Sequence, residues 1–356
     1  MWWLVAGSMI RHLAADPRAI YASHIAKRGI VYLDTNVWID FAQERTALAS
    51  ETLRLARAAR GTQLVIFPVS YPAAFELMNQ RVTGATRHQA RLMDELSERV
   101  SFRAIHHVRD MEVLHAYECL MEGSGRDLRE QIFTAAAWHS GDGYWDYPDG
   151  WDEEDATACS SMLSRELPGL EWLQENLPRT EFESTYRTVD ENWVTTVAAL
   201  DQEAIRRFVN ADGTPSATKL RLEEYAHIVQ AYFVKKLPRL VGFAATALAL
   251  EKGAERIGRG GPATMKKLIE LLPSIWLSCE MHVRRRLEKN RLPKVQDLYD
   301  HDHAMLGIPY CDAFVTGDGE LLDLVRKCGA QSKYACRLVH GMKELHDYLQ
   351  QVVLDA

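Results

Sequence analysis

The feature that most restricts the fold is a short apolar strand that ends in a carboxylate and is followed at once by a helical pattern. Residues 29–34 read Gly-Ile-Val-Tyr-Leu-Asp, and the apolar residues after them recur with helical spacing. A second cycle comes next, with a helix predicted over residues 51–60, a strand over 63–68 and a further helix that opens at Ser70. Strands that alternate with helices favour a parallel sheet with helices packed on its faces. This part of the chain is therefore predicted to be α/β.

The end of the chain resumes the alternation. The pattern predicts a helix over residues 300–307 and a strand over 313–316, then a helix over 320–327 and a strand over 335–340. A last amphipathic helix is predicted over residues 342–353. We therefore expect the two ends of the chain to build one sheet.

The long middle of the chain has a different character. Its residues look mainly helical and contain few strand-like runs, which indicates an α/β domain split by a large helical insertion. The expected division is an N-terminal helical arm over residues 1–28, a first α/β part over 29–110, a helical insertion over 111–294 and a second α/β part over 295–356.

Composition restricts the class of protein. The chain has 356 residues, 47% of them hydrophobic and 26% charged, which is ordinary for a globular protein. No apolar run approaches the length of a membrane span, and the six cysteines lack the spacing of a zinc site, so we expect a cytoplasmic protein with reduced thiols and no membrane partner. The net charge of -7 argues against bulk attraction to nucleic acid but leaves room for a local basic surface.

Acidic residues crowd the segment 297–318. It holds Asp297, Asp300, Asp302, Asp312 and Asp318, more carboxylates than a structural helix needs. Carboxylates that lie close together repel one another, so such a cluster is costly unless a cation neutralises it. Hard oxygen ligands favour Mg²⁺ or Mn²⁺. The segment therefore indicates a divalent-metal site.

A second source of carboxylates is the first predicted strand. Asp34 ends that strand, and the carboxyl edge of a parallel sheet is where open α/β folds bind ligands. The strand at 313–316 delivers Thr316, Gly317 and Asp318 to the same edge. We expect two adjacent strand ends to share one site.

These residues match a family pattern. The Asp-Thr-Asn at 34–36, the Ser-x5-Glu of Ser70 and Glu76, the Asp-x2-His of Asp300 and His303, and the run Pro-Tyr-Cys-Asp-Ala-Phe-Val-Thr-Gly-Asp at 309–318 resemble the PIN domain nucleases. The resemblance covers roughly residues 29–105 and 295–356. It implies a three-layer α/β/α sandwich whose acids bind one or two divalent ions for phosphodiester cleavage. The long insertion departs from the compact members of that family.

The resemblance also implies roles for single residues. The residues implied as metal ligands and catalytic acids are Asp34, Glu76, Asp300, Asp312 and Asp318. Asn36 and Thr316 match polar positions that support the site, and His303 is implied either to contact substrate or to orient Asp300. Asp297 and Asp302 remain alternatives to Asp300 as the third ligand.

A basic run precedes the acidic segment. It contains Arg284, Arg285, Arg286, Lys289 and Arg291. On general grounds such a run is a solvated helix face; its position beside the acids makes nucleic-acid contact the competing interpretation.

The function predicted from these features is a metal-dependent endonuclease that acts on RNA rather than DNA. It would serve as a toxin held by a protein antitoxin or as a defence enzyme, and a homodimer is an open alternative for its assembly. The rival hypothesis is a non-catalytic PIN-fold scaffold whose helical insertion binds a protein partner.

Overall fold

The computed structural model describes residues 25–80, 83–135, 170–171, 195–196, 198–288 and 294–355. Nearly all of the expected N-terminal arm lies outside the described residues, and so do Lys289 and Arg291 of the basic run. Among the described residues, no helix combines the length and the apolar character that a membrane span requires.

The described residues divide into two compact units. An α/β unit contains residues 25–80, 83–105, 129–135, 170–171 and 302–355, and a helical unit contains residues 106–128, 195–196, 198–288 and 294–301. These limits differ from the boundaries expected at residues 110 and 294. Residues 129–135 belong to the α/β unit because they include a strand that pairs there, and the second change of unit falls inside one helix, between His301 and Asp302.

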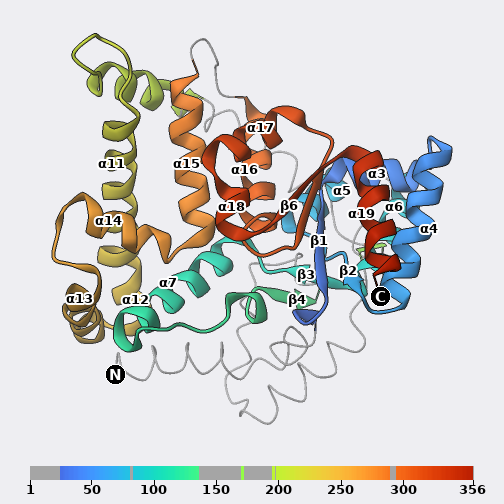
Figure 1. The fold of residues 1–356 in the computed structure, drawn as a ribbon, viewed down its shortest axis with the longest axis horizontal. Coiled ribbons are helices and arrows are strands. Elements are labelled where there is room, and N and C mark those ends of the chain that lie inside the picture. The colour runs from blue at the N-terminus through green and yellow to red at the C-terminus, as the bar shows by residue number, and fades with distance from the viewer. Residues whose placement is uncertain are drawn as a thin grey trace. The chain divides into compact units, whose positions relative to one another are not determined.

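The α/β unit contains a four-stranded parallel sheet, which confirms the α/β class (Figure 1). Its strands are β1 (Gly29–Leu33), β2 (Val65–Ile66), β5 (Ala313–Thr316) and β6 (Arg337–His340), in the order β2-β1-β5-β6. All three pairings are parallel, and Val31 lies opposite Ala313. Strand β5 has the bounds that the sequence predicts. Strands β2 and β6 are shorter than predicted.

The sheet order reverses between β1 and β5. From β1 the chain moves outward to β2, and residue Val69 just after β2 forms a parallel bridge with Ser101 of β3 (Val100–Phe102). Strand β3 pairs in turn with the antiparallel β4 (Phe133–Ala135). The chain then returns on the other side of β1, as β5 and β6. Strand order that reverses in this way marks the ligand-binding crevice of open α/β sheets.

Polar side chains fix where the helices of this unit begin. Thr46 caps the first turn of one helix by accepting a hydrogen bond from Ala49 N, and Thr83 and Thr86 form a reciprocal capping box at the start of another.

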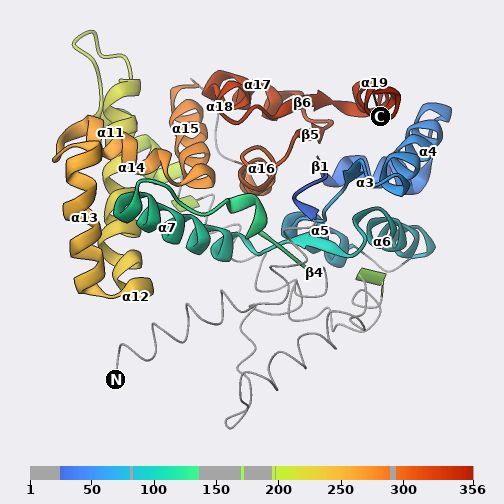
Figure 2. The same cartoon turned by 60° about the horizontal axis from the view of Figure 1, so that its bottom comes forward.

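Two helices from opposite ends of the chain, α4 (Ala47–Gly61) and α19 (Gly341–Leu354), lie side by side in both views (Figures 1 and 2). The helices are α3 (Thr35–Gln43), α4 (Ala47–Gly61), α5 (Tyr71–Asn79), α6 (Gly84–Ser97), α17 (Gly319–Cys328), α18 (Ala330–Tyr334), α19 (Gly341–Leu354) and the last turns of α16 (Val295–Gly307).

The core of the α/β unit is built around the strands. Val31, Val315 and Val339 are all buried, and the ring of Tyr32 stacks on that of Phe314 with centroids 5.2 Å apart. Gly307, the last residue of α16, lies against this stack. An added Cβ there would come within 2.4 Å of the Phe314 ring and 2.8 Å of the Tyr32 ring.

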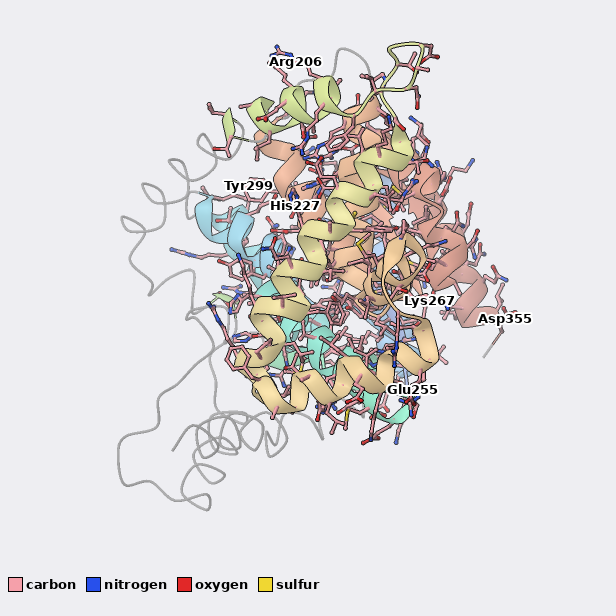
Figure 3. The ribbon with its side chains drawn as sticks, turned by 90° about the vertical axis from the view of Figure 1, so that its left-hand side faces the viewer. Arg206, His227, Glu255, Lys267, Tyr299 and Asp355 are labelled. Atoms are coloured by element: carbon pink, nitrogen blue, oxygen red, sulfur yellow. The ribbon has the colours of Figure 1, made fainter. Side chains whose placement is uncertain are left out.

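The helical unit has no strand in its described residues beyond an isolated bridge. Figure 3 views its helices with the charged side chains of Arg206, His227, Glu255 and Lys267 at the surface. Its helices are α7 (Ile105–Glu122), α11 (Ala217–Ile228), the π-helix η3 (Val229–Lys236), α12 (Leu237–Val241), α13 (Phe243–Ile257), α14 (Gly261–Glu270), α15 (Pro273–Leu287) and the first turns of α16.

We predict that Gly307→Ala destabilises the protein by about 1–3 kcal/mol, because its methyl group overpacks the ring stack. The matched control is Gly84→Ala on α6, where an added Cβ meets nothing within 4 Å. Urea unfolding of both variants and the wild type measures the effect. An equal midpoint for all three proteins would contradict the packing described here.

Candidate functional site

The candidate site lies at the carboxyl edge of the sheet, at the point where the strand order reverses. Asp34 directly follows β1, Thr316 ends β5, and Asp318 comes two residues later. Because β1 and β5 are adjacent and parallel, their carboxyl ends meet at one edge. The structure therefore brings together residues from opposite ends of the chain.

The Asp34 carboxylate is held by neutral donors. Its Oδ1 accepts a hydrogen bond of 2.7 Å from Thr35 N, which caps α3, and its Oδ2 accepts one of 2.6 Å from the Thr316 hydroxyl. The residue is 7% exposed. Helix capping alone would use one oxygen, so the second contact ties Asp34 to the end of β5.

The Thr316 hydroxyl connects two acids. While it donates to Asp34, its oxygen accepts a hydrogen bond of 3.0 Å from Asp318 N. The Asp318 carboxylate in turn caps α17, because Oδ1 accepts from Leu321 N at 2.9 Å. A single buried hydroxyl therefore fixes the backbone of Asp318 relative to the side chain of Asp34.

Glu76 and Asp34 converge on one histidine. Nε2 of His303, on α16, lies 3.6 Å from Asp34 Oδ1 and 3.8 Å from Oε1 of Glu76, on α5. Burial by itself would raise the pKa of the Glu76 carboxyl. A hydrogen bond from His303, the charge of His303 when it is protonated, and a smaller contribution from Thr35 outweigh burial and lower that pKa below its ordinary value. Glu76 is thus held as a carboxylate.

Tyr32 contacts His303 at Nδ1, the ring nitrogen that does not face the acids. Its hydroxyl lies 2.6 Å from Nδ1 of His303, and burial raises the pKa of this phenol well above its ordinary value, although a hydrogen bond from Ser70 opposes the rise. Tyr32 and Ser70 are both buried. The residue-level prediction did not include Tyr32. A signal was present, since Tyr32 lies two positions before Asp34 on a strand and so on the same side, with a polar end that needs a partner when buried.

Asp312 lies at the opposite edge of the sheet, which departs from its predicted place in the site. It precedes β5, and its Oδ2 accepts a hydrogen bond of 2.7 Å from Ile30 N at the start of β1. Arg129 donates to both of its carboxylate oxygens, at 3.1 and 2.9 Å. The length of the strand separates Asp312 from Asp34, and its role here is to clamp the amino ends of β1 and β5.

The candidates for the third ligand belong to α16. Asp297 and Asp300 lie in the helical unit, where Nη2 of Arg285 is 3.2 Å from Asp297 Oδ1 and 3.9 Å from Asp300 Oδ2. Asp302 is half-buried on the next turn, in the α/β unit. Both Asp297 and Asp300 thus have an arginine partner, and Asp300 stays a candidate on its spacing to His303.

Two arginines of the basic run are paired with acids of their own unit. Arg286 forms ion pairs with Asp201 and Glu224, and Arg285 pairs with Asp297 as described above. The side chains of Arg285 and Arg286 are only 12% and 11% exposed. These two guanidinium groups hold the helical unit together, and nucleic-acid contact by the basic run stays a prediction.

Two kinds of acid can now be distinguished. Asp312 and Asp297 each form an ion pair with an arginine, which neutralises their charge. Among the described residues, no Lys or Arg forms an ion pair with Asp34, Glu76 or Asp318, whose partners are backbone amides, a hydroxyl and His303. The second group keeps its negative charge available to a cation.

The donor set suits a hard divalent ion, although it is not gathered around one point. Each carboxylate has lone pairs beyond the hydrogen bonds it accepts, and oxygen donors of this kind fit Mg²⁺ or Mn²⁺. Within the described part of the chain, no three His, Cys, Asp or Glu side chains are arranged to hold a metal ion. The His303 ring lies between two of the candidates. Asn36 is exposed on the first turn of α3, beside Asp34.

Comparison of the chain with protein-family models, with curated proteins and with solved structures finds no match. The functional argument therefore depends on the geometry and chemistry of the site.

We predict that the stabilising effect of Glu76 disappears in acid. Its folded pKa lies below the ordinary value of 4.5, so the contribution of the carboxylate is complete above that pH and is lost as the pH falls through the folded pKa. The difference in unfolding free energy between the wild type and Glu76→Gln, measured in EDTA, should shrink on acidification. Glu255→Gln, at an exposed position, is the control. A difference that widens in acid would refute the assignment.

We also predict that Asp312→Ala destabilises the protein by about 1–3 kcal/mol, because it leaves Ile30 N and Arg129 without their acceptor. Asp323→Ala removes an exposed acid paired with Arg326 and should cost less than about 1 kcal/mol. Denaturant unfolding of the two variants tests the clamp. Equal losses would show that Asp312 is an ordinary surface acid.

Proposed function

We propose that this protein is a divalent-metal-dependent nuclease of the PIN-like type, with Asp34, Glu76 and Asp318 as its acids. The observation that carries the proposal is the location, at the carboxyl edge where the strand order reverses, of three carboxylates that form no ion pair with an arginine of the described residues. Carboxylates whose partners are neutral donors have no opposite charge already beside them, and such oxygen donors suit a divalent cation.

The chain's own residues would prepare the site in three ways. Asp34 and Glu76 would hold an ion through the oxygen lone pairs that their hydrogen bonds leave, and Thr316 fixes the spacing between Asp34 and the Asp318 loop. Asn36 is exposed on the first turn of α3, and we propose that it contacts the substrate. When bound, Mg²⁺ or Mn²⁺ lowers the pKa of a water ligand and stabilises charge on the scissile phosphate.

The same reasoning extends to the fold. We propose that the sheet is the middle layer of a three-layer α/β/α arrangement and that the helical unit is an insertion into it. The parallel order β2-β1-β5-β6, with β3 beyond β2, supports this, since doubly wound sheets carry helices on both faces.

RNA is the substrate that we propose, following the resemblance to PIN domain ribonucleases. Arg285 and Arg286 are held in ion pairs, so the phosphates would be bound elsewhere on the protein. As a cytoplasmic ribonuclease, the protein would require control by an inhibitor protein. Growth arrest on expression, relieved by Asp34→Asn, is the expected sign of this activity.

The proposal predicts cleavage that requires both a metal and the acids. Purified protein is incubated with labelled single-stranded RNA, structured RNA and DNA in Mn²⁺, in Mg²⁺ or in EDTA. We expect RNA cleavage in Mn²⁺ or Mg²⁺ and none in EDTA. Asp34→Asn and Asp318→Asn should each reduce the rate by about 100-fold or more, because metal-bound charge stabilisation is worth several kcal/mol.

The control for charge is Asp323→Asn, an exposed acid on α17 that should cleave at the wild-type rate. If every substrate stays intact and calorimetry detects no Mn²⁺ binding that Asp34→Asn abolishes, the nuclease proposal fails. The non-catalytic scaffold then becomes the better description.

A further inference from the structure

A chain of buried polar groups lies behind the two acids that converge on His303. Tyr32 belongs to β1, His303 to α16 and Ser70 is the residue that caps α5. None of the three is more than 2% exposed. Hydroxyl and imidazole groups buried this deeply need hydrogen-bond partners, and the Tyr32 hydroxyl is paired with both Nδ1 of His303 and Ser70.

The two ring nitrogens of His303 face different partners. Nδ1 lies 2.6 Å from the Tyr32 hydroxyl, whereas Nε2 faces Asp34 at 3.6 Å and Glu76 at 3.8 Å. A neutral imidazole has one N–H and one acceptor nitrogen, and the partner of one nitrogen decides which proton the other carries. A carboxylate can only accept, so the nitrogen that faces the acids is the one that should carry the proton. Nδ1 must then accept from the Tyr32 hydroxyl.

We propose that Ser70, Tyr32 and His303 form a directed hydrogen-bond chain that positions Asp34 and Glu76 for metal binding. Ser70 donates to Tyr32, Tyr32 donates to Nδ1 of His303, and the Nε2–H of His303 points at both carboxylates. The residues are positioning residues and need no contact with substrate. The inference depends on the proposed function, because only that function makes Asp34 and Glu76 metal ligands.

The packing around Tyr32 keeps the chain rigid. Its ring stacks on Phe314 with centroids 5.2 Å apart, contacts Phe102 at 5.7 Å and meets the His303 ring edge-on at 5.7 Å. Tyr32→Phe keeps these ring contacts and removes only the hydroxyl. Nε2 of His303 lies 3.8 Å from Oε1 of Glu76, so the histidine lies directly beside this carboxylate. Groups that orient metal ligands typically contribute 10- to 100-fold to affinity.

The first measurement concerns the metal-free protein. Nitrogen-15 NMR of the histidine ring, assigned with His303→Gln, reports which nitrogen carries the proton. We expect the proton on Nε2 in the wild type, and a changed ring spectrum in Tyr32→Phe. The control is Tyr348→Phe, which removes a hydroxyl on α19 and should leave the His303 signals unchanged. A proton on Nδ1 of the wild type would overturn the direction of the chain.

The second measurement is Mn²⁺ binding by calorimetry. Tyr32→Phe should weaken the affinity about 10-fold and His303→Ala by about 10- to 100-fold, while Tyr348→Phe binds as the wild type does. His303→Gln keeps a side-chain N–H donor and should recover part of the loss, which a purely structural role would not produce. Unchanged affinity in Tyr32→Phe overturns the proposal. If the wild type binds no Mn²⁺, the proposed function fails, and the proton location alone then decides whether the hydrogen-bond chain exists.

Discussion

The pairing of β1 with β5 is the constraint on which the site depends. It joins residues that lie 282 positions apart, as in the hydrogen bond from Thr316 to Asp34. Closing a loop of that length costs about 5 kcal/mol beyond a constant term. Burial of an aliphatic or aromatic side chain returns about 1.5–3 kcal/mol, and the facing residues Val31, Tyr32, Phe314 and Val315 are all buried. A few strand residues therefore offset the loop and set the spacing of the acids.

The protein treats its acids in two ways. Two acids that hold elements together have an arginine: Asp312 has Arg129 at the amino edge of the sheet, and Asp297 has Arg285 in the helical unit. At the carboxyl edge the partners are amides, hydroxyls and a histidine, which fix the geometry without cancelling the charge. Hydrogen bonds to a charged group are worth roughly 1.5–3 kcal/mol, enough to hold a carboxylate in place. The difference in partners distinguishes Asp312 and Asp297 from Asp34 and Asp318.

Much of the α/β frame could be predicted from the sequence because it depends on local pattern. An apolar run of β-branched residues that ends in Asp34 gives a strand and a helix start, and β5 has the predicted bounds. The resemblance placed Asp312 among the ligands, yet a residue that precedes a parallel strand lies at its amino edge, which the predicted strand already implied. The boundary near residue 129 could not be predicted, because β4 pairs only with the distant β3.

The sequence by itself determined which residues are acids, which strands end in them and that parallel strands would present them at one edge. The tertiary structure decided which acids meet one another and which meet an arginine. Arg285 and Arg286 illustrate this, since a basic run that suggested phosphate contact is closed into ion pairs with acids as far away in sequence as Asp201. Tyr32 gains its partner His303 in the same way. Packing between distant segments determines which partner a charged or polar group meets, so the local sequence pattern cannot predict that partner.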